Sequence, residues 1–474
     1  MGRYLGLDVG TTTITALALD AASGEVVAVR TVPNACEVTS PEDRRRGRSE
    51  WDAAKMVALA LGVIREAVRA GGTTQGIGVT GQMHGTLLVS EAGAPVGPFI
   101  GWQDRRGMEA PDGRSYVERI QALADELGAG GRICKPRAGY LGTTLFWMAV
   151  NGVLPRVPFV ASFLPDYIVA SLTGARPVTD ATDAAGSGLF DVFSLKWEEG
   201  LIGALGLSRG MLPEAQPSGS RAGGLTRAAA AATGLPEGLP VCVACGDNQA
   251  SFAGSVGDYG HDLLVNIGTG GQVSAHVDRA MLTEGLEARP YVDGKYLLVG
   301  AGLVGGRSYA WLRDVFREIG RAFFGGGGDE DLYDAMNRLA AAVPPGCEGL
   351  RCEPLFTGTR REPDRRGVWS GVGAANFTPG HLARALLEGI AEQFRLMYGE
   401  MERLGAGGRT RLIGAGNGVR KNPLLREILA DAFGMRMQTP AHREEAAFGA
   451  ALLAAVGDGA FSRLQEAGKL IRYE

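Results

Sequence analysis

Three short apolar runs, separated by turn residues, open the chain. They cover residues 4–9, 13–19 and 25–32, and glycine, threonine, serine and aspartate lie between them. Runs of this length and spacing predict strands that pair as an antiparallel meander. Residues 52–68 then carry apolar side chains at helical spacing, and residues 76–82 have the pattern of another buried strand. This order predicts an α/β unit with a mixed sheet.

The opening pattern returns in the second half of the chain. Residues 263–277 align with residues 5–19 almost without adjustment, so that Asp8-Val9-Gly10-Thr11 corresponds to Asn266-Ile267-Gly268-Thr269. A further strand pattern follows at residues 295–302. We therefore predict an internal duplication, in which each of two similar domains opens with a strand, a glycine–threonine corner and a second strand.

The length of 474 residues also favours two domains over one core. Residues 213–240 are rich in proline, glycine and small side chains, as connecting segments are. We predict domains at residues 1–245 and 246–474. A run of four glycines at residues 325–328 predicts a flexible loop.

Composition and charge exclude several classes of protein. The chain is 45% hydrophobic and 21% charged, and its net charge of −4 predicts no nucleic-acid partner. Met1-Gly2-Arg3 leads directly into the first strand pattern, and the longest nearly apolar stretch, residues 56–64, is too short to span a bilayer. We expect a cytoplasmic protein that binds no membrane.

The six cysteines are scattered, which fits a reducing compartment. Cys242 and Cys245 have the CxxC spacing of some redox and metal sites. They lie within an apolar run, however, so we predict buried strand thiols.

Asp8 lies near the end of the first predicted strand, next to a glycine–threonine corner. Backbone N–H groups and hydroxyls at such a corner suit a phosphate, and two facing corners could hold different phosphates of one nucleotide. The Walker A pattern and the GxGxxG pattern after the first strand are both absent. A carboxylate at this place suits Mg²⁺ bound through water, because the ion keeps much of its hydration shell. An aspartate that caps a turn is the alternative.

Two later segments carry similar chemistry. Asp247 follows a strand pattern and stands where a helix would begin. It is either a helix cap or, at the opening of an interdomain cleft, the carboxylate that accepts the hydroxyl proton during phosphoryl transfer. Residues 413–437 combine a strand, a glycine-rich turn and an amphipathic helix. Close backbone approach at such a turn suits adenine or ribose, although similar turns are common structural joints.

The ordered set of motifs over the full chain resembles the FGGY carbohydrate kinases of the sugar kinase/Hsp70/actin superfamily. The motifs are GLDVGTTT (6–13), TGQMHG (80–85), GWQDRR (101–106), DYIVASLTG (166–174), TDATDAAGSGLFD (179–191), GDNQA (246–250), EGIAEQF (388–394), GAGNGVRKN (414–422) and EEAAFGAALLA (444–454). The resemblance implies an α/β fold of two ribonuclease-H-like domains with an interdomain cleft. It also implies ATP and Mg²⁺ in that cleft and phosphorylation of a sugar or polyol hydroxyl.

The same resemblance implies roles for individual residues. Asp247 corresponds to the general base, and Asp8 and Asp247 to the carboxylates associated with Mg²⁺. The residues expected to contact ATP are Thr11 and Thr12 in the first domain, Gly268 and Thr269 in the second, and Gly414, Gly416, Asn417 and Asn422 around the adenosine.

TGQMHG is similar to the xylulokinase-like branch of the family, which implies that Met83 and His84 touch the sugar. The other candidates for sugar binding are Gln82, Trp102, Asp104, Arg105, Asp247 and Asn248. A histidine can hydrogen-bond hydroxyls through either ring nitrogen, and a tryptophan offers an apolar ring face. Core packing is the alternative for His84 and Trp102.

GWQDRR and GAGNGVRKN are closer to the sedoheptulokinases, whereas GDNQA and NIGTGGQVS are not strictly of that type. We predict a ketose kinase, with sedoheptulose first and xylulose or another pentulose or polyol second. Glycerol is disfavoured because no NQRETT-like segment occurs. A non-catalytic, ATP-binding regulatory protein is the alternative, but it would not need Asp247. The expected partners are a small-molecule sugar and ATP, and a homodimer stays open.

Overall fold

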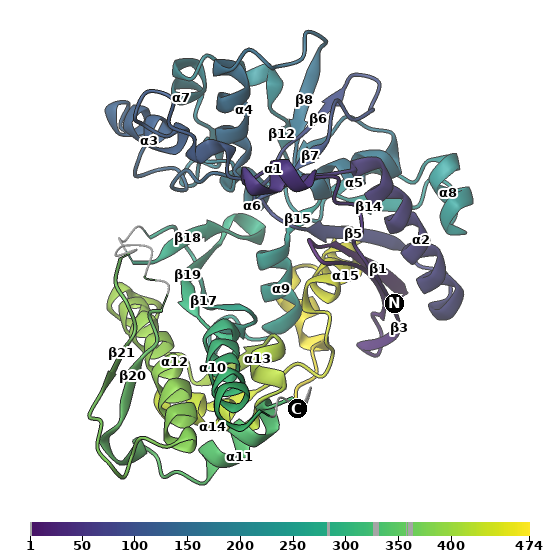
Figure 1. Ribbon diagram of the computed structural model, residues 1–474. Coiled ribbons are helices and arrows are strands. Elements are labelled where there is room, and N and C mark those ends of the chain that lie inside the picture. The colour runs from purple at the N-terminus through teal and green to yellow at the C-terminus, as the bar shows by residue number, and fades with distance from the viewer. Residues whose placement is uncertain (1, 282–284, 326–330, 357, 359–363) are drawn as a thin grey trace.

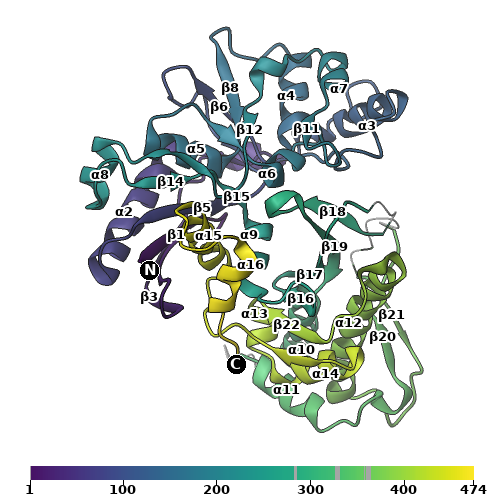
Figure 2. The ribbon, with the colours of Figure 1, turned by 180° about the vertical axis from the view of Figure 1, so that it is seen from behind.

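The computed structural model describes residues 2–281, 285–325, 331–356, 358 and 364–474. Figure 1 shows two lobes, and Figure 2 shows them from behind. Each lobe contains one large sheet. The predicted flexible loop at residues 325–328 lies outside the described residues, except for Gly325, which ends helix α10 (Gly306–Phe324).

The first large sheet contains the predicted meander. Its strands are β1 (Arg3–Val9), β2 (Thr13–Asp20), β3 (Glu25–Pro33), β5 (Gly76–Gly81), β13 (Arg221–Gly224), β14 (Pro240–Cys242) and β15 (Cys245–Gly246). β1, β2 and β3 pair antiparallel in sequence order, and β5 lies parallel to β1 on its other side. β14 and β15 both pair with β5 in parallel. The predicted meander and mixed sheet are confirmed.

Helix α2 (Ala53–Gly71) covers one face of this sheet. It begins after Asp52, whose carboxylate accepts a hydrogen bond from the backbone N–H of Lys55 at 2.9 Å. Met56 and Ile64, at helical spacing, belong to the apolar core shared with the sheet. The predicted helix and its start are confirmed.

Shorter elements surround the first large sheet and form the outer part of the upper lobe in Figure 1. The helices are α1 (Pro41–Arg45), α3 (Tyr116–Glu126), α4 (Leu141–Val150), α5 (Leu164–Thr173), α6 (Ala181–Ala185), α7 (Glu199–Ala204) and α8 (Arg227–Thr233). The short strands pair as β4 (Glu50–Trp51) with β7 (Phe99–Ile100), β6 (Leu87–Ser90) with β8 (Phe159–Ser162), β9 (Val178–Thr179) with β12 (Glu214–Ala215), and β10 (Phe190–Asp191) with β11 (Lys196–Trp197). A second apolar core, which includes Phe163 and Phe190, joins many of them.

The second large sheet repeats the first. Its strands are β16 (Asp262–Ile267), β17 (Gly270–Val277), β18 (Glu287–Pro290), β19 (Tyr296–Val304), β22 (Arg411–Ala415) and β23 (Arg436–Gln438). β16, β17 and β19 form an antiparallel meander, and β22 lies parallel to β16 as β5 does to β1. The order and direction of β14-β5-β1-β2-β3 therefore match those of β23-β22-β16-β17-β19, which confirms the predicted duplication.

Helices of the second lobe pack on this sheet. Besides α10 they are α11 (Tyr333–Ala341), α12 (Pro379–Met401), α13 (Asn417–Arg420) and α14 (Pro423–Phe433), and β20 (Arg351–Glu353) pairs with β21 (Val368–Ser370) at the edge of the lobe. Ile390 and Phe394 of α12 are buried in the core beneath the sheet. No helix in the described ranges combines the length and the apolar character that a bilayer crossing requires.

Two helices connect the lobes at the centre of both views: α9 (Asp247–Ser255) and α15 (Glu445–Gly457). They cross at two glycines, because a Cβ atom on Gly254 would lie 1.9 Å from the carbonyl oxygen of Glu445, and one on Gly449 1.9 Å from that of Ala250. α15 also packs against β1 and β5. A helix that begins only at Glu445, and precedes the short α16 (Leu464–Ala467), thus covers the first sheet. The predicted boundary after residue 245 stays a prediction.

The two cysteines with CxxC spacing are buried in the first sheet. Cys242 lies in β14 and Cys245 in β15, and both are free thiols. Burial raises the pKa of Cys242 to about 12. The predicted buried strand thiols are confirmed.

Candidate active site

Three neighbouring parallel strands of the first sheet end at the same edge. Thr80 of β5 pairs with Asp8 of β1 on one side and with Cys245 of β15 on the other. Asp8, the residues after β5 and Asp247, which begins α9, therefore lie together at this edge. Their positions follow from the sheet register and from the chain order, because parallel strands present their carboxyl ends on one side.

The two carboxylates at this edge are hard to ionise. Loss of solvent raises the pKa of Asp8 to about 7, with smaller contributions from the charges of Asp247 and Glu444. Burial also raises the pKa of Asp247 to about 6, although the backbone N–H of Asn248 and the guanidinium of Arg289 act in the opposite direction. A cation between the carboxylates would relieve both effects.

The chemistry of these donors fits Mg²⁺. Oδ1 of Asp8 is buried and has no hydrogen-bond partner among the described residues. Within the same residues, no three His, Cys, Asp or Glu side chains are grouped as metal ligands. Mg²⁺ accepts one or two carboxylates and takes its other ligands from water and phosphate. Asp8 and Asp247 are thus sufficient protein ligands for such an ion.

The segment after β5 places Gln82, Met83 and His84 next to Asp247. A Cβ atom on Gly246 would lie 2.8 Å from Sδ of Met83, so the Met83 side chain packs directly against the backbone that precedes Asp247. His84 has a left-handed φ of 68°, and its ring stacks on Tyr140 with 4.2 Å between centroids. Its Nδ1 donates to the carbonyl oxygen of Gly186 at 3.0 Å, which makes Nε2 the acceptor nitrogen of the neutral ring.

The predicted sugar-binding loop, which follows β7, contains both solvent-exposed and buried residues. Trp102 is 47% exposed, and its indole N–H donates to Oγ1 of Thr11 at 3.0 Å. The side chain of Arg105 is exposed. Trp102 and Arg105 can therefore meet a ligand, and both stay predicted sugar contacts.

The structure contradicts the prediction that Asp104 contacts the sugar. Its side chain is fully buried, and its oxygens accept hydrogen bonds from the backbone N–H groups of Ser49 and Arg106, each at 2.9 Å. The Arg106 guanidinium adds two bonds at 2.8 and 2.9 Å. With all its acceptor sites engaged, Asp104 does not contact a sugar. It anchors the loop that carries Trp102.

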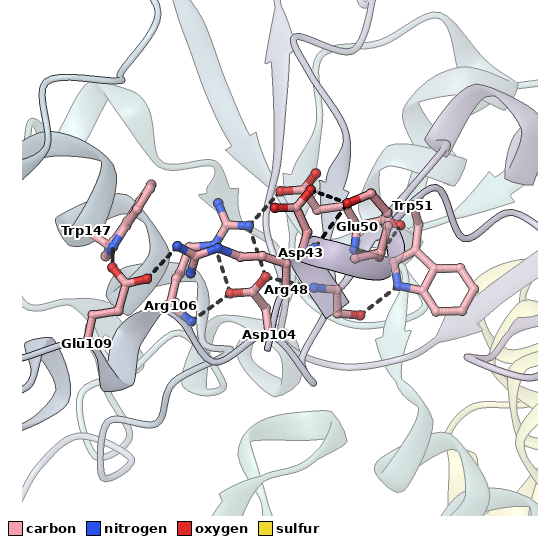
Figure 3. A network of polar contacts seen from close by, with 11 residues as sticks. Asp43, Arg48, Glu50, Trp51, Asp104, Arg106, Glu109 and Trp147 are labelled. Carbon is pink, nitrogen blue, oxygen red and sulfur yellow. Dashed lines mark hydrogen bonds and ion pairs between the residues drawn. The ribbon is translucent and has the colours of Figure 1, made fainter. Parts of the chain in front are cut away.

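Figure 3 shows the network around this anchor. Arg106 also donates to Glu50 at 2.7 Å, and the guanidinium groups of Arg48 and Arg106 lie 5.2 and 5.0 Å from the centre of the Trp147 ring. Glu109 accepts from the Trp147 indole at 2.7 Å and pairs with Arg48. These contacts join the segment before α2 to α4 and fix the loop between them.

Both predicted glycine–threonine corners form tight turns. The N–H of Gly10 donates to the carbonyl oxygen of Thr13 at 3.0 Å, and that of Gly268 to Gly270 at 2.9 Å. Thr12 is exposed and Thr11 is half-buried. Each corner is thus closed by a backbone hydrogen bond from its glycine, to the third residue on in the first corner and to the second residue on in the second.

A cavity of about 900 Å³ in the second lobe contains five of the predicted nucleotide residues. They are Gly268, Thr269, Gly416, Asn417 and Asn422. Gly418 of the predicted glycine-rich turn also lines it, whereas the sequence did not point to Gly305, Gly306, Arg307, Tyr309, Tyr333, Asp334 and Asn337. Gly305-Gly306 after β19 was the available signal, since it repeats the strand–glycine–helix pattern used for residues 413–437.

A close backbone approach at Gly416 and the hydrogen bonds of Asn422 shape this cavity. Gly416 has a φ of 81°, and a Cβ atom there would lie 2.5 Å from the carbonyl oxygen of Ile267, so only glycine fits. Asn422 caps α14 through the N–H of Leu425 at 3.0 Å, and its amide donates to Asn337 at 3.0 Å. α11, α13 and α14 are thus joined at one wall.

The structure also contradicts the prediction that Gly414 lies beside the adenosine. It lies inside β22, paired with Val265, and is buried. A Cβ atom on it would lie 2.6 Å from Val419 and 3.3 Å from Met437. Gly414 is therefore required by core packing, and it does not line the nucleotide cavity.

Asn248 links the site to β18. Its Oδ1 accepts from Nη1 of Arg289 at 2.8 Å, and Arg289 also pairs with Glu287. Glu287 in turn pairs with Arg137 at 3.3 Å. Because Arg137 belongs to the first lobe and Glu287 to the second, these ion pairs connect the lobes beside Asp247.

Comparison with known proteins agrees with this architecture. Residues 3–254 match the N-terminal domain of the FGGY family of carbohydrate kinases, and residues 263–457 match the C-terminal domain. A glycerol kinase of Aromatoleum aromaticum is 31% identical, with 98% of this chain and 92% of that protein covered. A xylulose kinase of Lactococcus lactis subsp. lactis is 28% identical, with 99% and 90% covered.

The structure of xylulose kinase from Rhodospirillum rubrum superposes with a TM-score of 0.86 at 28% identity, covering 100% of this chain and 93% of that one. The predicted resemblance and the two-domain fold are confirmed. The relatives named here act, by name, on glycerol or xylulose, and they lend no support to sedoheptulose.

Proposed function

Because the chain belongs to the FGGY family of carbohydrate kinases, and is thus a phosphotransferase with an alcohol group as acceptor, we propose that its acceptor is a ketose, with D-xylulose as first candidate. The observation that carries the proposal is the placement of Asp247 at the edge where β1, β5 and β15 end. There it lies with Asp8 and with the segment Gln82–His84.

Asp247 is the general base in this proposal. Its half-buried carboxylate has a pKa of about 6, so it is ionised at neutral pH and still basic enough to accept a proton in the transition state. The acceptor hydroxyl would give its proton to Asp247 as its oxygen bonds to the terminal phosphorus of ATP, while the bond from that phosphorus to the bridging oxygen breaks and ADP leaves.

ATP would span the two lobes. The 900 Å³ cavity is large enough for adenosine, and the corners offer backbone N–H groups and hydroxyls to the phosphates. The residues proposed for ATP are Thr11, Thr12, Gly268, Thr269, Gly416, Asn417 and Asn422.

Asp8 and Asp247 would hold Mg²⁺, whose charge offsets that of the phosphates. The unpartnered Oδ1 of Asp8 supports this placement.

The choice of D-xylulose rests on the Met83–His84 pair, which resembles the xylulokinase-like branch, and on the xylulose kinase relatives. Gln82, Trp102, Arg105 and Asn248 complete the proposed sugar site. Glycerol is the second candidate because a glycerol kinase is 31% identical over nearly the whole chain. Sedoheptulose, favoured by two sequence motifs, is the third.

An ADP-release assay tests the proposal. Purified protein with Mg-ATP is measured against glycerol, D-xylulose, D-ribulose, sedoheptulose and gluconate, and kcat/KM is compared among them. D-xylulose should give the highest value. A higher value for glycerol or sedoheptulose would overturn the substrate, and ATP binding without turnover on any acceptor would favour the regulatory alternative.

A further inference from the structure

A short chain of hydrogen bonds links the predicted sugar-binding loop to the first glycine–threonine corner. The indole N–H of Trp102 donates to Oγ1 of Thr11 at 3.0 Å, and Oγ1 of Thr11 donates to Oε1 of Gln82 at 3.3 Å. A threonine hydroxyl has one hydrogen and two acceptor lone pairs. Because an indole N–H can only donate, the single hydrogen of Thr11 is committed to Gln82.

Gln82 stands at the other end of this chain with part of its amide unused. Its residue is 2% exposed, and its Nε2 has no hydrogen-bond partner in the described part of the chain. Buried donors in folded proteins are nearly always satisfied. Gln82 follows β5, between the strands that lead to Asp8 and Asp247, so its free donors lie where the acceptor sugar is proposed.

The two ligands compete with the same internal hydrogen bond. A phosphate oxygen accepts hydrogen bonds, so Thr11 can bind it only by withdrawing its hydrogen from Gln82. Oε1 of Gln82 has two lone pairs, and that withdrawal frees the one held by Thr11 for a sugar hydroxyl. A sugar hydroxyl that takes this lone pair first likewise frees the hydrogen of Thr11 for phosphate. Each ligand therefore removes an obstacle to the other.

Trp102 fixes the orientation of the Thr11 hydroxyl. Its N–H occupies one lone pair of Thr11 and so fixes the side on which the hydrogen points. The loop of Trp102 is rigid, since Asp104 and Arg106 anchor it two to four residues on and a Cβ atom on Gly139 would lie 2.0 Å from the Trp102 carbonyl oxygen.

We propose that Trp102, Thr11 and Gln82 form a hydrogen-bond relay that makes sugar and ATP bind with positive cooperativity, with Trp102 as its positioning residue. The inference rests on the proposed function, because it takes the sugar and ATP as ligands. By linkage the coupling is reciprocal, so sugar raises the affinity for nucleotide by the factor with which nucleotide raises that for sugar.

The test measures this factor by calorimetry. The Kd of Mg²⁺ with a non-hydrolysable ATP analogue is determined with and without a saturating acceptor, taken as whichever of D-xylulose and glycerol turns over faster. The full-length wild-type protein should show a ratio of roughly three to ten, the range of one ordinary hydrogen bond. In Trp102→Phe, which keeps a ring but loses the N–H, the ratio should fall toward one.

A double-mutant cycle separates the relay from simple sugar contact. In a Thr11→Val background, Trp102→Phe should change the ratio no further, and Thr11→Ser should keep the wild-type ratio. Trp197→Phe is the matched control, because it loses an indole hydrogen bond, to Pro213 at 2.9 Å, far from the corner. An unchanged ratio in Trp102→Phe, or a loss that persists in the Thr11→Val background, would overturn the relay.

A second readout does not need the acceptor. The ATP analogue alone should change the emission of Trp102, seen as the difference between wild type and Trp102→Phe, because Thr11 turns away from Gln82 when phosphate binds. This change should occur even if no tested sugar is phosphorylated, so failure of the relay and failure of the proposed function remain distinguishable. An emission response identical in the two proteins would count against the relay.

Discussion

The carboxylate of Asp104 accepts two hydrogen bonds from the guanidinium of Arg106, and the pair is shut off from solvent. The sequence suggested a sugar contact at Asp104. In the structure its partners are all internal, so its loss should act on folding before it acts on substrate binding.

Asp104→Ala should lower the free energy of unfolding by about 3–5 kcal/mol, because it leaves the buried Arg106 charge without its main partner. Urea denaturation measures this loss. Asp112→Ala is the control, since its ion pair with Arg119 is 4.0 Å long and exposed, and its effect should stay within about 0.5 kcal/mol. A stable Asp104→Ala protein with only a raised KM would contradict this role.

The pH dependence of catalysis should report Asp247. The base works as a carboxylate, so kcat/KM should be constant above neutrality and fall as pH drops through about 6, the pKa of Asp247. Because Asp8 lies close and burial raises its pKa to about 7, the acidic fall of kcat/KM reports the joint ionisation of Asp8 and Asp247. Raising the Mg²⁺ concentration should move it to lower pH, since a cation favours both carboxylates. If the acidic fall of kcat/KM stayed at the same pH at every Mg²⁺ concentration, the metal would have to bind elsewhere.

Asp247→Asn should reduce kcat by about 10²–10⁴-fold while the ATP analogue still binds, as expected for loss of a general base. Stopped-flow turnover and calorimetry provide the two measurements. Asp258→Asn, in the loop after the other end of α9, is the control and should retain activity. Turnover near the wild-type value in Asp247→Asn would rule this residue out as the base.

Asp8→Asn should stabilise the protein at pH 8 more than at pH 5 when Mg²⁺ is absent. The folded-state pKa of Asp8, about 7, lies above its ordinary value of 3.8, so the fold loses stability as pH rises from about 4 to about 7, and the full loss is present above pH 7. At pH 5 only a minor part of this loss has developed, so the substitution gains less there. Melting temperatures at the two pH values decide the point; equal shifts would show that Asp8 is not held in a strained charge state.

Gly416→Ala should weaken binding of the ATP analogue by more than about tenfold, because the new Cβ atom would displace the carbonyl oxygen of Ile267 at the cavity wall. Gly434→Ala is the matched control. Gly434 also has a positive φ, 61°, but nothing lies within 4 Å of its Cβ position. It should cost about 1–2 kcal/mol of stability and leave nucleotide affinity unchanged. Equal affinities in both variants would argue against the cavity as the adenosine site.

Local patterns predicted much of the fold. The alternation in residues 4–32 and its return at residue 263 gave both meanders, because strand pairing between neighbours depends on short-range sequence. Asp8, Gln82 and Asp247 could be located in advance because Asp8 lies near the end of a strand and the other two directly follow one. The long-range return of α15 to the first sheet could not, since nothing within a helix of small residues indicates which sheet it covers.

The errors have the same origin. Asp104 stands beside Arg105 in the sequence, but the backbone turns so that Arg106 and Ser49 meet it. Gly414 looked like part of a glycine-rich ligand turn, yet the strand continues through it, and Gly416 and Gly418 line the cavity instead. Gly305 and Gly306 at the start of α10 carried an overlooked strand–glycine–helix signal, whereas the residues of α11 were missed because their sequence carries no ligand motif and only the packing of the lobe brings them to the wall.

The covering of the first sheet by α15 has a consequence for synthesis on the ribosome. Gly6 of β1 and Gly78 of β5 pack against the backbone of Ala447 and Ala450 in α15. These strands are therefore synthesised long before the helix that covers them, which begins only at Glu445. Until some 450 residues have emerged, one face of that sheet lacks its cover. The N-terminal half is therefore exposed to chaperones and to aggregation for most of translation, and truncation before α15 leaves it without a complete core.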